Sequence, residues 1–231
     1  GISVAGPCIA GEHYMLGAQE RCHELMELID GKQFFVLHAA RQTGKTTLLN
    51  NLEQELNAGD QYHALYCSLE SVQPFTRPEQ GIPAVVRAIR QAIDYHPVLA
   101  EFGFAREHAL DDINTVVGQG FVDLARALNR PLVVLFDEAD CLSNGTLIGF
   151  LRQLRNGYVN RIRIPFIHSL ALVGMRNIRD YKAKMRDDRD TLGSASPFNI
   201  VKAALTLRCF TRDEVGELYG QHTADTGQQF T

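Results

Sequence analysis

Short apolar runs alternate with amphipathic stretches along the chain, and this alternation predicts the fold class. Runs of strand length occupy residues 34–38, 64–69, 132–135, 169–174 and 203–207. Apolar residues recur at helical spacing over 48–56, 82–93, 115–128 and 147–154, and further helices are predicted around 179–185 and from Thr211. Strands that alternate with helices are typical of right-handed crossover connections. We therefore predict an α/β fold with a five-stranded parallel sheet covered by helices.

Length and composition fit one domain. The chain has 231 residues, of which 45% are hydrophobic and 22% charged, so we treat residues 1–231 as one core domain with 1–33 as an N-terminal segment. The 23 basic and 27 acidic side chains give a formal net charge of −4. This balance excludes a globally basic nucleic-acid-binding surface and leaves only a local basic patch open.

Cysteine spacing and hydropathy predict a cytoplasmic location. The five cysteines form no Cys-x-x-Cys pair and no zinc-binding spacing, which favours reduced, buried thiols in a cytosolic protein. No apolar run approaches the roughly 20 residues that span a bilayer, so we expect no membrane partner. Residues 186–200 are polar and contain Gly, Ser and Pro, which predicts a long surface loop. The chain begins with Gly1 instead of Met, as a trimmed fragment would.

The strongest chemical signal lies between the first apolar run and the helix that follows it. Residues 39–46 (AARQTGKT) match the phosphate-binding pattern G-x-x-x-x-G-K-[ST], except that Ala39 stands in place of the first glycine. Gly44 lets the backbone approach phosphate groups, Lys45 adds a positive charge, and the Thr46 hydroxyl can bind Mg²⁺. The predicted phosphate-binding residues are Ala40, Arg41, Gln42, Thr43, Gly44, Lys45, Thr46 and Thr47.

Two acidic residues follow the run at 132–135, whose continuous apolar character predicts a strand buried on both faces. Asp137 at the end of such a strand would hold Mg²⁺, and Glu138 would orient and activate an attacking water. Alternatively, the two acids form a helix N-terminal pair favoured by the helix dipole. The phosphate-binding pattern upstream favours the first interpretation.

Polar residues after the run at 169–174 are further candidates. Asn177 or Arg176 would reach a γ-phosphate or the attacking water if that strand lies beside the first one. The alternative is ordinary turn chemistry. The negative charge that develops on the γ-phosphate could also be stabilised by an arginine, and the candidates are Arg152, Arg155, Arg161 and Arg163. The alternative is that these arginines are solvated surface residues. The sequence does not choose among the four.

Taken together, the segments ARQTGKTTLL, LVVLFDEAD and LVGMRN resemble those of the prokaryotic AAA-like ATP-binding proteins, which are grouped with AAA+ and STAND-type P-loop ATPases. The resemblance implies a three-layer P-loop NTPase sandwich with strand order 5-1-4-3-2 and helices on both faces. It also implies that Tyr14 and Met15 line an adenine pocket, although a helix leading into the core would show the same residues. Because the chain stops at Thr231, we expect the C-terminal lid or winged-helix region of such families to be absent.

These residues predict an ATPase that binds Mg-ATP and hydrolyses it to ADP and phosphate to drive a conformational change. Glu138, Lys45 and Asn177 are the predicted catalytic residues, and Thr46 and Asp137 the predicted metal ligands. Alternatives are a nucleotide-gated STAND-like interaction switch with little turnover, or an AAA+ helper of a DNA transaction. GTP is disfavoured because the chain contains no Asn-Lys-x-Asp motif. Expected partners are ATP or ADP, a second copy in a homo-oligomer and an unidentified protein client, whereas the net charge does not favour nucleic acid.

Overall fold

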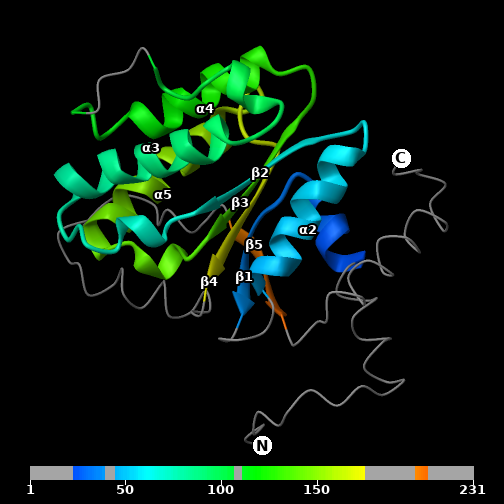
Figure 1. Cartoon of the computed structure of the whole chain (residues 1–231), viewed down its shortest axis with the longest axis horizontal. Helices are drawn as coiled ribbons and strands as arrows, with labels where there is room; N and C mark the ends of the chain where they lie inside the picture. The colour runs from blue at the N-terminus through cyan, green and yellow to red at the C-terminus, as the bar shows by residue number, and fades with distance from the viewer. Residues whose placement is uncertain (1–22, 40–44, 107–110, 175–200, 208–231) are drawn as a thin grey trace, which may run out of the picture.

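The computed structural model of the protein describes residues 23–39, 45–106 and 111–174 and the backbone of 201–207 (Figure 1). Its strands are β1 (Phe34–Ala39), β2 (His63–Ser68), β3 (Leu132–Asp137), β4 (Ser169–Gly174) and β5 (Val201–Leu207). Its long helices are α2 (Lys45–Ala58), α3 (Pro78–Asp94), α4 (Val116–Ala127) and α5 (Asn144–Asn160), and residues 23–30 are also helical. Single 3₁₀ turns at Glu70–Val72, Leu99–Glu101 and Ala139–Cys141 were not predicted.

All strands of the sheet run parallel. β3 pairs with β2 on one side and with β4 on the other, and β4 pairs with β1. The order 1-4-3-2 is therefore confirmed, with β4 between β1 and β3. The sequence predicts five strands. Side chains are described for four of them, β1 to β4. The backbone of β5 pairs with the free side of β1, and it extends the order to β2-β3-β4-β1-β5.

Helices cover both faces of the sheet, which confirms the three-layer arrangement. Figure 1 shows α2 on one face and α3, α4 and α5 on the other. Side chains alternate along β1, so Phe35 packs with the α2 core whereas Phe34 packs with the α3–α5 core. On the α3–α5 face, Phe136 makes edge-to-face ring contacts with Phe121 and Phe150. β3 is buried along its whole length and is apolar up to Asp137, as a strand covered on both faces should be.

Side chains of α2 cover the outer edge of β2, the strand at the end of the sheet. The Asn57 side chain donates to the Ala64 carbonyl and accepts from the Ala64 N–H, each at 2.9 Å. The Glu53 carboxylate accepts the Tyr66 N–H at 2.8 Å. These bonds satisfy backbone groups that an edge strand otherwise leaves open, and they tie α2 to β2.

The main difference from the predicted elements is the length of α5. The sequence predicts a helix over 147–154, whereas the helix runs from Asn144 to Asn160. Its second half contains Gly157, which packs directly against the Phe166 ring, so tertiary packing extends the helix where local propensity is weak. The predicted helices around 179–185 and from Thr211 and the predicted loop at 186–200 lie outside the described residues.

Two of the other sequence predictions can be compared with the described part of the chain. Cys67 is a buried free thiol, and Cys141 is a partly buried one. Burial raises the pKa of the Cys67 thiol to about 12. None of the described helices combines the length and the apolar character that crossing a membrane requires.

Candidate functional site

The predicted site residues meet at the carboxyl edge of the sheet. β1 ends at Ala39 and β3 at Asp137, and Lys45 begins α2. The carboxyl ends of parallel strands lie at one edge, where ligand sites of open α/β sheets form. This topology brings Lys45 beside Glu138, although the two residues are 93 positions apart in the sequence.

Lys45 forms an ion pair with each of the two acids. Its Nζ lies 2.8 Å from Asp137 Oδ1 and 2.7 Å from Glu138 Oε1. The side chains of Lys45, Asp137 and Glu138 are 12%, 1% and 36% exposed, respectively. Burial acts to lower the pKa of Lys45, but hydrogen bonds to both carboxylates outweigh it and raise the pKa above its usual value. The two carboxylates thus converge on one positive charge.

Asp137 is buried but its carboxylate has a partner on each oxygen. Besides Lys45, Oδ1 accepts the Glu138 N–H at 2.8 Å, and Oδ2 accepts the Tyr66 hydroxyl at 2.9 Å. Burial and the negative charge of Asp137 raise the pKa of Tyr66, while a hydrogen bond from the Thr46 hydroxyl acts in the opposite direction. Tyr66 therefore stays protonated and donates to Asp137.

The backbone of Glu138 has a left-handed conformation, with φ 55° and ψ 38°. This conformation costs a residue with a Cβ atom roughly 1–2 kcal/mol. The hydrogen bond from the Glu138 N–H to Asp137 Oδ1 helps to hold it. Such outliers cluster at functional sites, where surrounding structure maintains them. Here the turn accompanies the contact between the Glu138 side chain and Lys45.

The structure describes only part of the predicted site. Thr46 and Thr47 lie in the first turn of α2 and are exposed. β4 ends at Gly174 between β1 and β3, so its carboxyl end lies at the same edge of the sheet as Lys45. The other predicted site residues lie outside the described part of the chain, namely Tyr14, Met15, Ala40, Arg41, Gln42, Thr43, Gly44, Arg176 and Asn177.

Tyr66 and Glu53 contribute to the site but were not found from the sequence. A tyrosine in a strand is ordinary strand composition, and a glutamate in a helix is an ordinary surface residue. The signal that would reveal Tyr66 is the register of β2 with β3. Ser68 of β2 lies opposite Asp137 of β3, and Tyr66, two residues before Ser68, points to the same face of the sheet. That register becomes visible only in the folded sheet.

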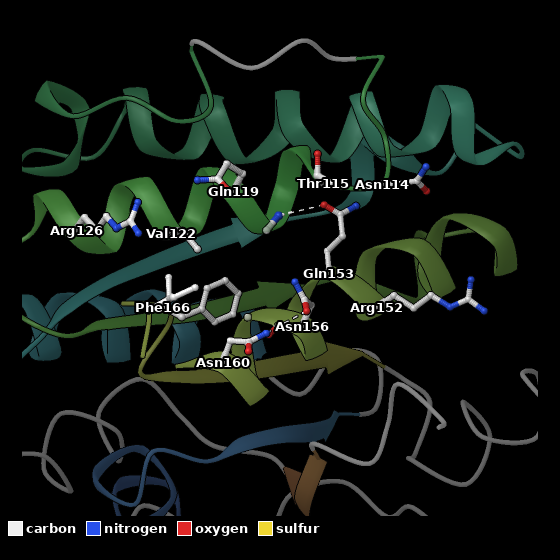
Figure 2. Close-up of a pocket in the computed structure, with 13 residues that line it drawn as sticks. Asn114, Thr115, Gln119, Val122, Arg126, Arg152, Gln153, Asn156, Asn160 and Phe166 are labelled. Carbon is white, nitrogen blue, oxygen red and sulfur yellow. Dashed lines mark hydrogen bonds between the residues drawn. The ribbon is translucent and has the colours of Figure 1, made fainter. Parts of the chain in front are cut away.

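Two of the candidate arginines lie away from Lys45. Arg161 Nη1 donates to the carbonyls of Lys32 and His168, at 2.8 and 3.3 Å, and its guanidinium lies 4.0 Å from the centre of the Tyr158 ring. Because Lys32 and His168 precede β1 and β4, Arg161 lies at the amino edge of the sheet. Arg152 lines a pocket between α4 and α5 (Figure 2).

This pocket has a volume of about 400 Å³ and is lined by both polar and apolar side chains. Figure 2 shows amide side chains from both helices around it, with Phe166 beside them. The Gln153 side chain joins its walls, because Oε1 accepts the N–H groups of Val117 and Gly118 at 2.9 and 3.1 Å and Nε2 donates to the Ile113 carbonyl at 2.7 Å. The residues that line the pocket do not include Lys45, Asp137 or Glu138.

A helix-covered parallel sheet, with a Gly-Lys-Thr sequence after its first strand and an acidic pair at the end of a neighbouring strand, defines a P-loop NTPase domain. Residues 28–181 match the family model described as an AAA domain. The match covers more than half of the chain, and the protein belongs to this family of P-loop ATPases. The resemblance seen in the sequence is thereby confirmed.

Solved structures agree with this fold. The Walker-type ATPase PabY2304 of Pyrococcus abyssi matches with a TM-score of 0.51 and 15% identity, over 91% of this chain and 58% of that chain. Drosophila ORC, bound to poly(dA/dT) DNA and Cdc6, matches with a TM-score of 0.50 and 12% identity, over 90% of this chain and 32% of that one. The ORC2 protein of Aeropyrum pernix, in its ADPNP-ADP complexes, matches with a TM-score of 0.47 and 14% identity, over 90% and 51% of the two chains.

The chain therefore spans 58% of the length of the Pyrococcus abyssi protein. At these identities, the likeness to the first two structures establishes the fold alone. No curated protein sequence matches the chain.

Proposed function

We propose that the protein binds Mg-ATP and hydrolyses it to ADP and phosphate, and that hydrolysis drives a conformational change. The observation that carries this proposal is the convergence of Asp137 and Glu138 on the Lys45 ammonium, 2.8 and 2.7 Å away. A positive charge and two carboxylates at the carboxyl edge of a P-loop sheet are the groups that phosphoryl transfer from a nucleotide requires.

The donor set at this edge fits Mg²⁺. Magnesium in nucleotide sites is held by one or two carboxylates and by substrate phosphates, with several waters retained. Among the described residues, no group of three or more His, Cys, Asp or Glu side chains is placed to hold a metal ion by itself. Asp137, which accepts a hydrogen bond from Tyr66, and the hydroxyl of Thr46 in the first turn of α2 would supply the oxygen ligands that such a shared site needs. When bound, Mg²⁺ would neutralise charge on the β- and γ-phosphates.

Each side chain has a role in this proposal. Lys45 exchanges its carboxylate partners for phosphate oxygens, together with the amides of residues 40–44, and so binds the triphosphate. This exchange frees Asp137 and Thr46 for the metal. It also frees Glu138, which is partly exposed to water, to accept a proton from the attacking water. We further propose that Asn177 orients that water and that Tyr14 and Met15 contact the adenine.

Nucleotide binding and phosphate release by point variants test these roles. Lys45→Ala should lose nucleotide binding, because it removes the positive charge that faces the phosphates. Glu138→Gln should bind ATP normally and release phosphate at least about a hundredfold more slowly, because the amide cannot accept the proton. Glu101→Gln makes the same chemical change at an exposed position in the Leu99–Glu101 turn and should match the wild type. Normal hydrolysis by Glu138→Gln would show that the assignment of the base is wrong.

A nucleotide-gated switch with little turnover is a second candidate. The supporting observation is that Lys45 forms ion pairs with Asp137 and Glu138. If Lys45 turns to a nucleotide phosphate, these three side chains, which link β3 to α2, must rearrange. In this case the nucleotide state, rather than the turnover rate, controls assembly. Light scattering with ADP and with a non-hydrolysable ATP analogue distinguishes the two: a switch changes its oligomeric state between the ligands, even in Glu138→Gln.

A role in a DNA transaction is a further proposal. Drosophila ORC, one of the matched structures, is bound to DNA. The net charge of −4 gives this chain no general attraction to duplex DNA. Titration of a labelled duplex at low and physiological salt tests the proposal, and an absence of binding at both would reject autonomous DNA binding by this chain.

A further inference from the structure

Tyr66 connects the three elements that form the candidate site. It belongs to β2, its hydroxyl donates to Asp137 Oδ2 at 2.9 Å, and the Thr46 side chain acts on the same hydroxyl to lower its pKa. Asp137 ends β3, and Thr46 lies in the first turn of α2. One phenol therefore contacts Asp137 and lies near Thr46, the two side chains that the proposed function assigns to the metal.

The position of this phenol is set by the backbone around it. The Tyr66 N–H donates to Glu53, two turns after Thr46 on α2, at 2.8 Å. Asn57, one turn further, holds Ala64 of the same strand through two hydrogen bonds. The Tyr66 side chain packs against the core cluster to which α2 and β3 both contribute. The strand that carries the phenol is therefore tied to α2 and to β3.

The two oxygens of Asp137 have different partners. Oδ1 faces Lys45 and the Glu138 N–H, whereas Oδ2 faces Tyr66. If Lys45 turns to phosphate, Oδ1 loses one partner and becomes available, while Tyr66 still holds Oδ2. The carboxylate then keeps its orientation, as do metal ligands that hydrogen bond to an outer residue.

We propose that Tyr66 is a positioning residue that orients Asp137 for Mg²⁺ in the nucleotide complex. This inference rests on the proposed function, because it assumes that the Lys45 site takes Mg-nucleotide. It assigns to β2 a direct part in the metal site, which otherwise involves residues of α2 and β3.

The test compares ADP binding in EDTA with ADP binding during a Mg²⁺ titration, using a fluorescent ADP analogue. Tyr66→Phe removes only the hydroxyl. It should keep the affinity for ADP in EDTA within about twofold and should raise the Mg²⁺ concentration at half-saturation by about tenfold, the usual cost of losing an outer partner of a metal ligand. Tyr62→Phe is the matched control, because Tyr62 also donates to an aspartate, Asp30, at 2.7 Å, outside the site. It should leave the Mg²⁺ midpoint unchanged.

Two further variants test whether Tyr66 acts through Asp137. Replacement of Tyr66 by 4-aminophenylalanine keeps a donor at the same position and should restore the wild-type midpoint. In an Asp137→Asn background, Tyr66→Phe should cause no additional shift, because the shared partner is already altered.

The outcomes separate this inference from the proposed function. If the wild type binds no ADP with or without Mg²⁺, the proposed function fails. If the wild type binds ADP with a clear Mg²⁺ dependence and Tyr66→Phe has the same midpoint, the inference about Tyr66 alone is overturned. A loss of thermal stability in Tyr66→Phe with an unchanged midpoint likewise overturns it, because the hydroxyl would then support only the fold. If Tyr66→Phe does not fold, the 4-aminophenylalanine variant decides: a Mg²⁺ midpoint that differs from the wild type despite the retained donor overturns the inference.

Discussion

Individual polar residues in this protein tolerate burial because each has a specific set of partners. Asp137 is 1% exposed, and an isolated carboxylate there would be strongly disfavoured. Lys45, Tyr66 and the Glu138 N–H together satisfy both of its oxygens. The motif residues alone predicted Lys45, Asp137 and Glu138 as a group, but the tyrosine that completes the set carries no motif.

His96 gives a prediction at the same scale. The side chain is 5% exposed, its Nδ1 accepts the N–H groups of Val98 and Leu99 at 3.1 and 3.0 Å, and its Nε2 donates to the Ala64 carbonyl at 3.0 Å. An Nδ1 that accepts two bonds has no proton, so the native ring is neutral. Burial lowers the pKa of His96, although the bond to Ala64 acts in the opposite direction.

Stability should therefore fall on mild acidification. Below about pH 6.5 the unfolded chain binds a proton at His96 that the native state does not, so the free energy of unfolding decreases as the pH drops from 7.5 to 5.5. Urea unfolding at several pH values measures this. His96→Asn should be less stable at pH 7.5 and show a flatter pH dependence, whereas the exposed His23→Asn should keep the wild-type slope. An unchanged slope in His96→Asn would refute the assignment.

At the scale of elements, close contacts decide how the helices lie on the sheet. A Cβ atom at Gly157 of α5 would lie 2.1 Å from Cζ of Phe166, whereas one at Gly149 of the same helix would find its nearest atom, Cδ1 of Ile82, at 3.6 Å. The first contact is a severe overlap and the second is an ordinary van der Waals distance. α5 therefore needs glycine at one of these two positions only.

Alanine at the two positions should have opposite effects. Gly149→Ala should stabilise the protein by about 0.5–1 kcal/mol, because alanine favours a helix interior. Gly157→Ala should destabilise it by about 1–3 kcal/mol, because the Phe166 ring must move in a packed core. Chemical denaturation of both variants measures the difference. Equal effects would show that Gly157 and Phe166 do not pack as described.

At the scale of the whole molecule, ligand binding at the carboxyl edge should stabilise the folded chain. Free ADP at a hundred times its dissociation constant adds about 2.7 kcal/mol, which raises the midpoint of thermal unfolding by about 5–10 °C for a chain of this size. Lys45→Ala should show no such rise. Arg152→Ala alters only the pocket between α4 and α5 and should keep the full rise. A rise in Lys45→Ala equal to that of the wild type would place the nucleotide elsewhere.

Local patterns determined much of this protein by themselves. The strand β4 was predicted with its observed bounds, and α2, α3 and α4 were predicted within a few residues or a turn, because buried strands and amphipathic helices leave periodic signals over their own lengths. The Gly-Lys-Thr sequence and the acidic pair were readable for the same reason, since each is a contiguous segment whose chemistry depends on its immediate neighbours.

Only the tertiary structure decided what lies beside what. Strand register and packing between distant segments decide three features of the site. These are the contact of Tyr66 with Asp137, the hydrogen bonds from Asn57 and Glu53 to the edge of β2, and the left-handed turn at Glu138. The full length of α5 depends in the same way on Phe166, which lies beyond the helix in sequence. Such contacts join residues that are far apart along the chain, and no local pattern of hydrophobic and polar positions records them.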